Sequence, residues 1–274
     1  MEESPILVHG IKERNCPNSD IDLKVEEFKR LGYSILYNVL SEEVLQQARD
    51  KIDTVYAVQE KELGPGNTLA MLNDANIARA LLAYDDFFIK FAHDPMVAPY
   101  IAALLGDNYL LSSQVAILNQ PHQGHYQYCW HRDLNYQHFT SSRPLAVQAL
   151  YSIEPFTRET GGTIILPGSH LFEEFPSESY IRKHMIQIEC PPGSVLLVNS
   201  MTYHRTGENR SNSVRRAINN IFTIPMLQQA INLPKLLKGK FSDDPVLRKI
   251  LGYEWPTVDS VIEWRMHRIT RNKA

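Results

Sequence analysis

After Gly106 the chain becomes a succession of short segments rich in β-branched and aromatic residues, and this pattern limits the possible folds more than any other feature. Glycine, proline and asparagine turns separate the segments, which is typical of antiparallel strands. Many short strands joined in this way predict a sandwich or a barrel. The expected strands cover residues 109–119, 125–130, 144–153, 163–166, 185–189, 194–199 and 214–224.

The remaining parts of the chain show mainly helical patterns. Apolar residues recur at helical spacing, Gly32 follows the first such segment, and Ser41 precedes the second as a capping residue. Helices before and after a run of strands predict a jelly roll with helices against one face. The expected helices cover residues 20–30, 41–63, two or three segments within 75–105, and 258–269, with one early strand at 33–40.

A chain of 274 residues is compatible with one large β domain that carries helices. We therefore expect a single domain over residues 1–274. Within it, residues 22–106 would form a helical N-terminal support, residues 107–225 the jelly-roll core, and residues 226–274 the C-terminal helices.

Composition narrows the classes of function. A net charge of −3 and a pI near 6.4 argue against nucleic-acid binding, which needs a strongly basic face. The sequence contains no apolar run of about 18 residues, so no membrane span is expected. Its three cysteines are scattered, which predicts neither a disulfide framework nor a zinc site and favours a reducing cytoplasm. A small-molecule substrate fits these limits, and the oligomeric state stays open.

His131, Asp133 and the distant His204 are the candidate metal ligands. Side chains two positions apart in an extended segment point the same way, so His131 and Asp133 can hold one ion while Arg132 points elsewhere. His204 follows the apolar segment 195–198, which can fold alongside. Two histidines and one carboxylate on one face of an ion leave positions for a co-substrate and O₂, as in non-haem Fe(II) oxygenases.

An arginine eleven residues after His204 supplies a candidate anchor for a dicarboxylate co-substrate such as 2-oxoglutarate. A planar guanidinium binds a carboxylate with two parallel hydrogen bonds. Strand alternation places Arg215 with Ala217 and Asn219 on one face, and Arg216 on the other. Periodicity alone does not decide which arginine faces the pocket.

Several further motifs, in order along residues 22–225, resemble the phytanoyl-CoA dioxygenase family of Fe(II)/2-oxoglutarate oxygenases. The motifs are His131-x-Asp133, then ETGGTIILPGSH at 159–170, PGSV at 192–195, His204-x-Thr206-Gly207, and Arg215 followed by Ala217. The helix before Gly32-Tyr33 and the helix that begins after Ser41 also resemble that family.

This resemblance implies a double-stranded β-helix core in which His131, Asp133 and His204 bind Fe(II). It assigns the 2-oxoglutarate arginine to Arg215 and a second contact with the co-substrate to Thr206. The implied reaction consumes 2-oxoglutarate and O₂, releases succinate and CO₂, and hydroxylates an unactivated carbon. Asp133 is retained, whereas related halogenases lack this ligand, so hydroxylation (or a desaturation or epimerisation variant) is favoured over halogenation. His170, in the LPGSH turn, is expected to be structural.

Residues that contact the primary substrate are less clearly marked. Tyr136 and His138 follow Asp133 closely enough to line an entrance, and Gln148 is a further candidate. Leu150 stands near the position where the family has an aromatic neighbour of the co-substrate. The primary substrate itself cannot be read from these residues. Two other interpretations remain open: a metal- or small-molecule-binding jelly roll without turnover, and a zinc hydrolase with the same ligands.

Overall fold

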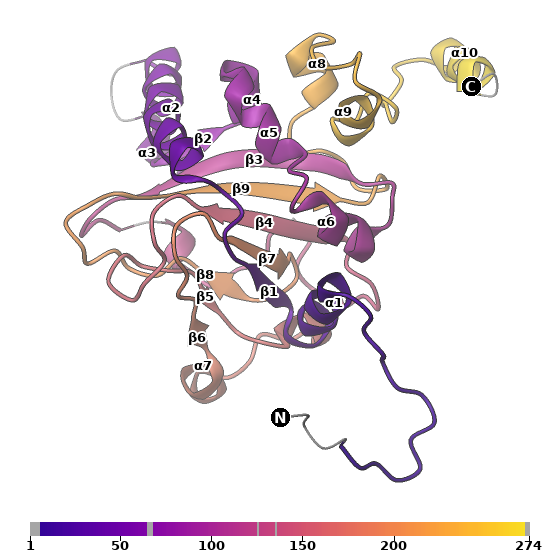
Figure 1. Ribbon diagram of the computed structural model, residues 1–274. Coiled ribbons are helices and arrows are strands. Elements are labelled where there is room, and N and C mark those ends of the chain that lie inside the picture. The colour runs from indigo at the N-terminus through magenta and orange to yellow at the C-terminus, as the bar shows by residue number, and fades with distance from the viewer. Residues whose placement is uncertain (1–5, 65–67, 125, 135, 272–274) are drawn as a thin grey trace.

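A six-stranded antiparallel sheet forms the centre of the protein, shown in the computed structural model in Figure 1. The structure describes residues 6–64, 68–124, 126–134 and 136–271. The strands of this sheet lie in the order β1-β7-β4-β9-β3-β2. Their bounds are β1 Tyr33–Leu36, β2 Ile77–Arg79, β3 Leu110–Asn119, β4 Ala146–Ser152, β7 Val195–Asn199 and β9 Arg215–Thr223.

A second, three-stranded antiparallel sheet has the order β6-β5-β8. Its strands are β5 Ile164–Ile165, β6 Ile186–Gln187 and β8 His204–Arg205. In Figure 1 this sheet lies below the large sheet, on the side away from α2, α4 and α5. One apolar core fills the space between the sheets and includes Leu150, Phe156, Ile165, Val198 and Ala217.

Helices cover the other face of the large sheet. They are α1 Asp20–Leu31, α2 Glu42–Glu62, α3 Thr68–Met71, α4 Leu81–Tyr84, α5 Ile89–Ala92 and α6 Ala98–Leu105, with a 3₁₀ turn η1 at Asp86–Phe88. Ser41 begins α2 because its hydroxyl accepts a hydrogen bond from the Val44 amide, and Gly32 ends α1 with a φ of 82°.

Alternation along β4 separates the two cores. Val147, Ala149 and Tyr151 pack against the helices, whereas Leu150 packs toward the second sheet. Side chains of successive residues in a strand point to opposite faces of the sheet. Each residue of β4 therefore packs on one face only, although both faces are buried. Gln148 therefore shares the inner face with Leu150.

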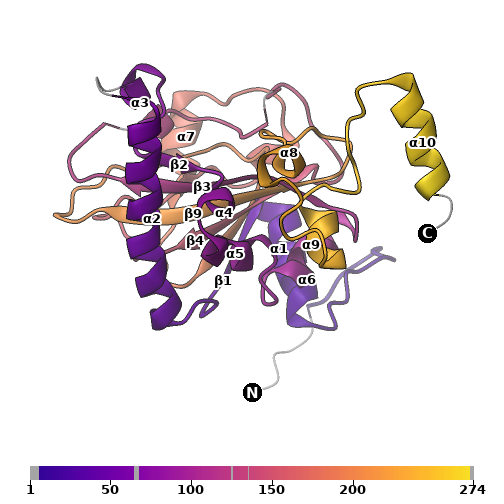
Figure 2. The same ribbon diagram turned by 90° about the horizontal axis from the view of Figure 1, so that it is seen from above.

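The remaining helices lie between strands or after the last strand. They are α7 Glu178–His184, α8 Leu233–Leu237, α9 Pro245–Ile250 and α10 Val261–Arg271, with 3₁₀ turns η2 Tyr126–Tyr128 and η3 Ser169–Leu171. Seen from above, α10 stands apart from the two sheets (Figure 2). Of the helices described, none is both long and apolar enough to cross a membrane.

The predicted fold class is confirmed, because antiparallel sheets with helices against one face form the observed architecture. The prediction of a strand over 125–130 is wrong. Residues Tyr126–Tyr128 form a 3₁₀ turn instead, and His125 lies outside the described residues. The Tyr128 hydroxyl lies 2.8 Å from the Gln123 carbonyl and 3.1 Å from Oδ1 of Asn119, and it shares its one hydrogen between these acceptors. These contacts hold the segment together with one long-range backbone bond, from the Thr206 amide to the Gln127 carbonyl at 2.8 Å.

Candidate metal centre

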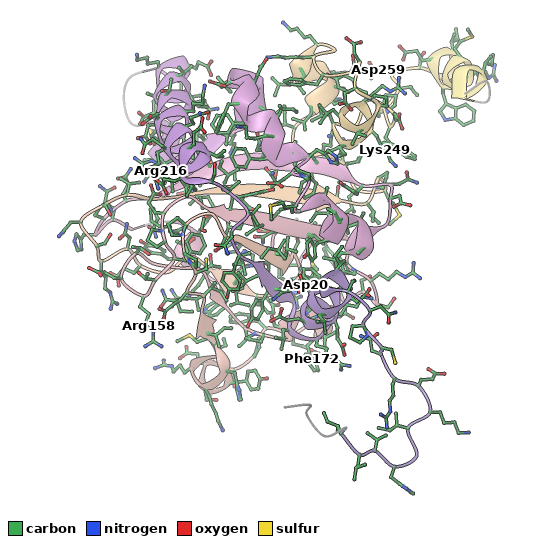
Figure 3. The ribbon with its side chains drawn as sticks, viewed as in Figure 1. Asp20, Arg158, Phe172, Arg216, Lys249 and Asp259 are labelled. Carbon is green, nitrogen blue, oxygen red and sulfur yellow. The ribbon has the colours of Figure 1, made fainter. Side chains whose placement is uncertain are left out.

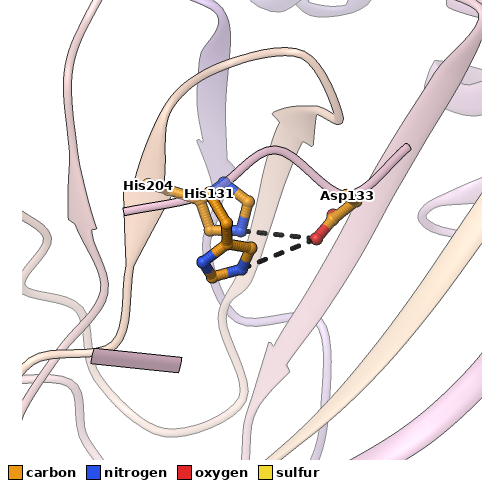
Figure 4. Close-up of side chains that lie close together, drawn as sticks. All are labelled: His131, Asp133 and His204. Carbon is orange, nitrogen blue, oxygen red and sulfur yellow. Dashed lines mark ion pairs between the residues drawn. The ribbon is translucent and has the colours of Figure 1, made fainter. Parts of the chain in front are cut away.

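Three side chains from two distant parts of the chain meet between the two sheets: His131, Asp133 and His204 (Figure 4). One potential ligand atom from each lies within 4.8 Å of the other two. His204 belongs to β8, and the other two lie on the segment just before the 134–143 loop. The structure therefore brings together the three residues that the sequence marks as candidate ligands.

Backbone pairing explains why they meet. His131 and His204 face each other across an antiparallel bridge, with N–H to carbonyl distances of 3.0 and 3.1 Å. Two residues further on, the Asp133 amide donates to the Ser200 carbonyl at 2.9 Å. These bonds hold the ligand segment against the turn between β7 and β8, so the convergence depends on tertiary pairing.

Both imidazoles are held in the orientation that metal binding requires. Nδ1 of His131 lies 2.9 Å from the Cys129 carbonyl, and Nδ1 of His204 lies 2.9 Å from the Thr202 carbonyl. Because a carbonyl only accepts, each Nδ1 carries the proton and each Nε2 keeps a lone pair. Such bonds to the far nitrogen fix the ring and the tautomer of histidine ligands.

The distances between the ligand atoms fit one shared ion. Oδ1 of Asp133 lies 3.8 Å from Nε2 of His131 and 3.6 Å from Nε2 of His204. Ligand atoms each about 2.1 Å from one ion lie about 3 to 4 Å apart. Burial is the largest influence on His204 and lowers its pKa, which keeps the ring neutral and able to bind a metal.

A buried guanidinium lies in the same cavity. Arg215 is 2% exposed, and its Nη2 donates to the Gly161 carbonyl at 3.1 Å. Its Nε has no hydrogen-bond partner among the described residues, and no described carboxylate forms an ion pair with it. Burial lowers the pKa of Arg215 to about 10, so the group stays cationic at neutral pH. A buried cation without a counter-ion is costly, which indicates a site for an anionic ligand.

Arg216 points the opposite way. It forms ion pairs with Asp53 of α2 at 2.7 Å and with Glu154 at 3.1 Å. Figure 3 shows Arg216 on the side of the molecule that carries α2. The hydrogen bond with Asp53 is the largest cause of a raised Arg216 pKa. Strand periodicity did not decide which of the two arginines faces the pocket. In the structure Arg215 faces the cavity and Arg216 faces α2.

The other predicted site residues divide into two groups. Thr206, Gln148 and Leu150 line the cavity together with the three candidate ligands and Arg215. Tyr136 and His138 do not line it; both are exposed on the loop after Asp133. Sequence reasoning placed Asn219 on the Arg215 face without giving it a role. It missed four other lining residues: Ile117, Gln127, Thr163 and Arg205. Strand alternation was the signal for Asn219, whereas Gln127 reaches the cavity from an irregular turn that no periodicity marks.

Two neighbouring structural features fit the expected motifs. Gly161 has a φ of +77°, and a Cβ there would lie 2.3 Å from the Gly207 carbonyl oxygen. Only glycine allows this approach, which places the Gly161 carbonyl beside Arg215. His170 contacts the backbone of α1 instead of the triad, with Nε2 3.1 Å from the Lys29 carbonyl. This position fits a structural histidine.

Arg132, between the first two candidate ligands, links two loops to the site. Its guanidinium is 2% exposed and lies 4.0 Å over the Tyr203 ring. It donates to four backbone carbonyls: those of Gln137 at 2.5 Å, Ser169 at 2.9 Å, Glu173 at 3.3 Å, and Phe172. The loop after Asp133 and the loop after η3 are thereby held to one side chain.

We expect Arg132→Met to lower the free energy of unfolding by about 2–4 kcal/mol, because it removes four charge-assisted hydrogen bonds and leaves the buried Ser169 carbonyl without that donor. Urea denaturation followed by circular dichroism measures the change. Arg158→Met is the matched control: Arg158 is 84% exposed in its ion pair with Glu189, lies at the surface in Figure 3, and should change stability by less than about 0.5 kcal/mol. Equal effects of the two substitutions would contradict this assignment.

The fold and the triad define a class of protein, the non-haem iron oxygenases built on a jelly roll. The sequence also matches the phytanoyl-CoA dioxygenase family over residues 28–217. The chain therefore belongs to the phytanoyl-CoA dioxygenase family of Fe(II)- and 2-oxoglutarate-dependent oxygenases, which confirms the resemblance described above.

Individual relatives and solved structures agree with this membership. An uncharacterised protein of Mycobacterium tuberculosis is 29% identical over 230 residues, covering 80% of this chain and 81% of the relative. Human peroxisomal phytanoyl-CoA dioxygenase is 21% identical and covers 73% and 68% of the two chains. The structure of EctD from S. alaskensis with 2-oxoglutarate and 5-hydroxyectoine superposes with a TM-score of 0.62 at 18% identity, covering 80% of each chain. At that identity the likeness supports the fold alone.

Proposed function

We propose that His131, Asp133 and His204 bind one Fe(II), that Arg215 and Thr206 hold the far carboxylate of 2-oxoglutarate, and that the enzyme hydroxylates an unactivated carbon of a small-molecule metabolite. One observation carries the proposal. Three converging ligand atoms and a buried guanidinium without an ion pair among the described residues line a single cavity. The donor set suits Fe(II), and the guanidinium suits a carboxylate.

Each residue has a defined task in this scheme. The two Nε2 atoms and Oδ1 of Asp133 would hold the metal on one side and leave the opposite side for ligands. Arg215 would hold the far carboxylate of the co-substrate with a charge-assisted hydrogen bond, and the Thr206 hydroxyl would add a second contact with it. Bound Fe(II) with 2-oxoglutarate and O₂ supplies the oxidising chemistry, which yields succinate, CO₂ and a hydroxylated product. Positioning is the contribution of the protein.

Differences in exposure suggest where the primary substrate enters. The His131 side chain is 26% exposed, compared with 12% for Asp133 and 8% for His204. The open side of the site therefore lies beside His131, next to the loop that follows Asp133. Tyr136 and His138, which are exposed on this loop, would contact a substrate outside the cavity.

The direct test is co-substrate turnover. Protein loaded anaerobically with Fe(II) and then given 2-oxoglutarate and air should form succinate above the level of an iron-free control, and a matching substrate should raise the rate further. Succinate is measured by chromatography and mass spectrometry. Succinate at the iron-free level across a substrate panel, with metal and 2-oxoglutarate still bound, would favour a binding protein without turnover.

The zinc hydrolase alternative makes a different prediction. Hydrolysis by such an enzyme would survive Arg215→Ala, because no keto acid takes part.

We further propose that residues 1–274 act as one oxygenase domain in the cytoplasm. Three scattered cysteines without disulfides, Cys16, Cys129 and Cys190, support that location.

A further inference from the structure

Gln148 occupies a position in the site that the roles assigned above do not explain. It lies in the middle of β4, is 2% exposed, and pairs in register with Val198 and Ile221. Its amide nitrogen donates a hydrogen bond to Oδ2 of Asp133 and lies 3.1 Å from Nε2 of His204. One amide group thus contacts two of the three candidate metal ligands.

The hydrogen bonds around the site determine how this amide is used. Oδ1 of Asp133 faces the two imidazole nitrogens, while Oδ2 accepts from Gln148. The two carboxylate oxygens therefore have different partners. Nε2 of His204 carries a lone pair because Nδ1 donates to the Thr202 carbonyl, so it can accept the second amide hydrogen.

We propose that Gln148 is a positioning residue that fixes Asp133 as a one-oxygen ligand of the metal, an inference that rests on the proposed function. A carboxylate held by one oxygen leaves its second oxygen free to rotate toward the same ion. Such rotation would take up a position that the keto acid needs. The amide of Gln148 would oppose this rotation, because Oδ2 would have to give up its hydrogen bond with the amide to turn toward the ion.

A second consequence concerns the other amide hydrogen. When the lone pair of His204 binds a metal, that nitrogen no longer accepts a hydrogen bond. The second N–H of Gln148 would then lose its acceptor on His204 and would be available to an oxygen of a bound ligand. Gln148 would thus help to orient the bound keto acid as well as Asp133.

The test measures metal binding in the absence of turnover. Gln148→Met keeps the length of the side chain and removes both N–H donors, and Gln148→Leu is a second variant in case the first does not fold. Titration calorimetry with Mn(II) should show an affinity 10- to 100-fold weaker than that of the wild-type protein, as expected when a residue that hydrogen-bonds to a metal ligand is lost. The visible absorption spectrum of the Co(II)-loaded protein should also change, because it reports the number of bound ligand atoms.

Gln114→Leu is the matched control. Gln114 is 1% exposed on strand β3 of the same sheet, but it faces the helices, where its amide oxygen accepts from the Leu82 amide at 2.9 Å and its amide nitrogen donates to the Phe88 carbonyl at 3.0 Å. This variant should lose stability while its Mn(II) affinity and Co(II) spectrum stay unchanged.

Two outcomes would overturn the inference in different ways. A folded Gln148 variant with unchanged Mn(II) affinity and an unchanged Co(II) spectrum would show that Gln148 does not position Asp133. If the unchanged protein bound no metal, or if Asp133→Ala bound it equally well, the proposed metal site itself would be wrong and the inference with it.

Discussion

Asp133→Ala should abolish 2-oxoglutarate-dependent succinate formation and weaken Fe(II) binding by more than about 100-fold. Removing a metal ligand should lower metal affinity more than removing a residue that only hydrogen-bonds to a ligand. Asp133 supplies the one anionic group of the triad, and its Oδ1 lies within 3.8 Å of both imidazole nitrogens. Without it, two neutral nitrogens remain to hold a dication. Succinate formation and Mn(II) titration measure the two effects separately.

Asp50→Ala serves as the control for this substitution, since Asp50 is an exposed carboxylate of α2. It should leave both turnover and metal affinity unchanged. Substantial succinate formation by folded Asp133→Ala protein with Fe(II) would contradict the triad. Thermal unfolding of each variant separates loss of a ligand from loss of the fold.

Much of the site was readable because strand periodicity acts on neighbouring residues. In the His131-Arg132-Asp133 segment, alternation predicts that the first and third side chains point together and the middle one apart. The structure shows this arrangement, with Arg132 bonded to carbonyls of two loops on the other side. The same rule separates Arg215 from Arg216 once the inner face of β9 is known.

Contacts that depend on the path of the chain were not readable. The approach of His204 rests on its bridge with His131, which links positions far apart in sequence. The irregular turn that carries Gln127 was predicted as a strand, since its composition matches a strand while its hydrogen bonds do not. The sequence marks Gln148 only as a candidate substrate contact, because its bond to Asp133 depends on the pairing of β4 with β7 and β9.

Short elements escaped prediction for a related reason. Strand β2 has only three residues, Ile77–Arg79, inside a region where helices were expected. Its conformation comes from pairing with Val115, Ala116 and Ile117 of β3. A strand of this length has little intrinsic preference, so the neighbouring strand determines its structure. The long, regular elements α1, α2, β3 and β9 lie close to their predicted positions.

Arg215→Ala should raise the dissociation constant for 2-oxoglutarate steeply. Losing a buried charge-assisted pair costs about 2–5 kcal/mol, which corresponds to an increase of about 30-fold to several thousand-fold. The effect is large because Arg215 is 2% exposed and no described carboxylate pairs with it, so an anionic ligand would be its main partner. Calorimetric titration of 2-oxoglutarate into Mn(II)-loaded protein measures the affinity without turnover.

Arg216→Ala is the matched control on the same strand. It removes the ion pairs with Asp53 and Glu154 and should lower stability, because those pairs tie β9 to α2 and to the chain beyond β4. Its affinity for 2-oxoglutarate should stay unchanged, because its side chain lies on the helix side of the sheet. Normal 2-oxoglutarate binding by the Arg215 variant together with weak binding by the Arg216 variant would place the co-substrate on the face of β9 that packs against the helices. This result would exclude Arg215 as the carboxylate anchor.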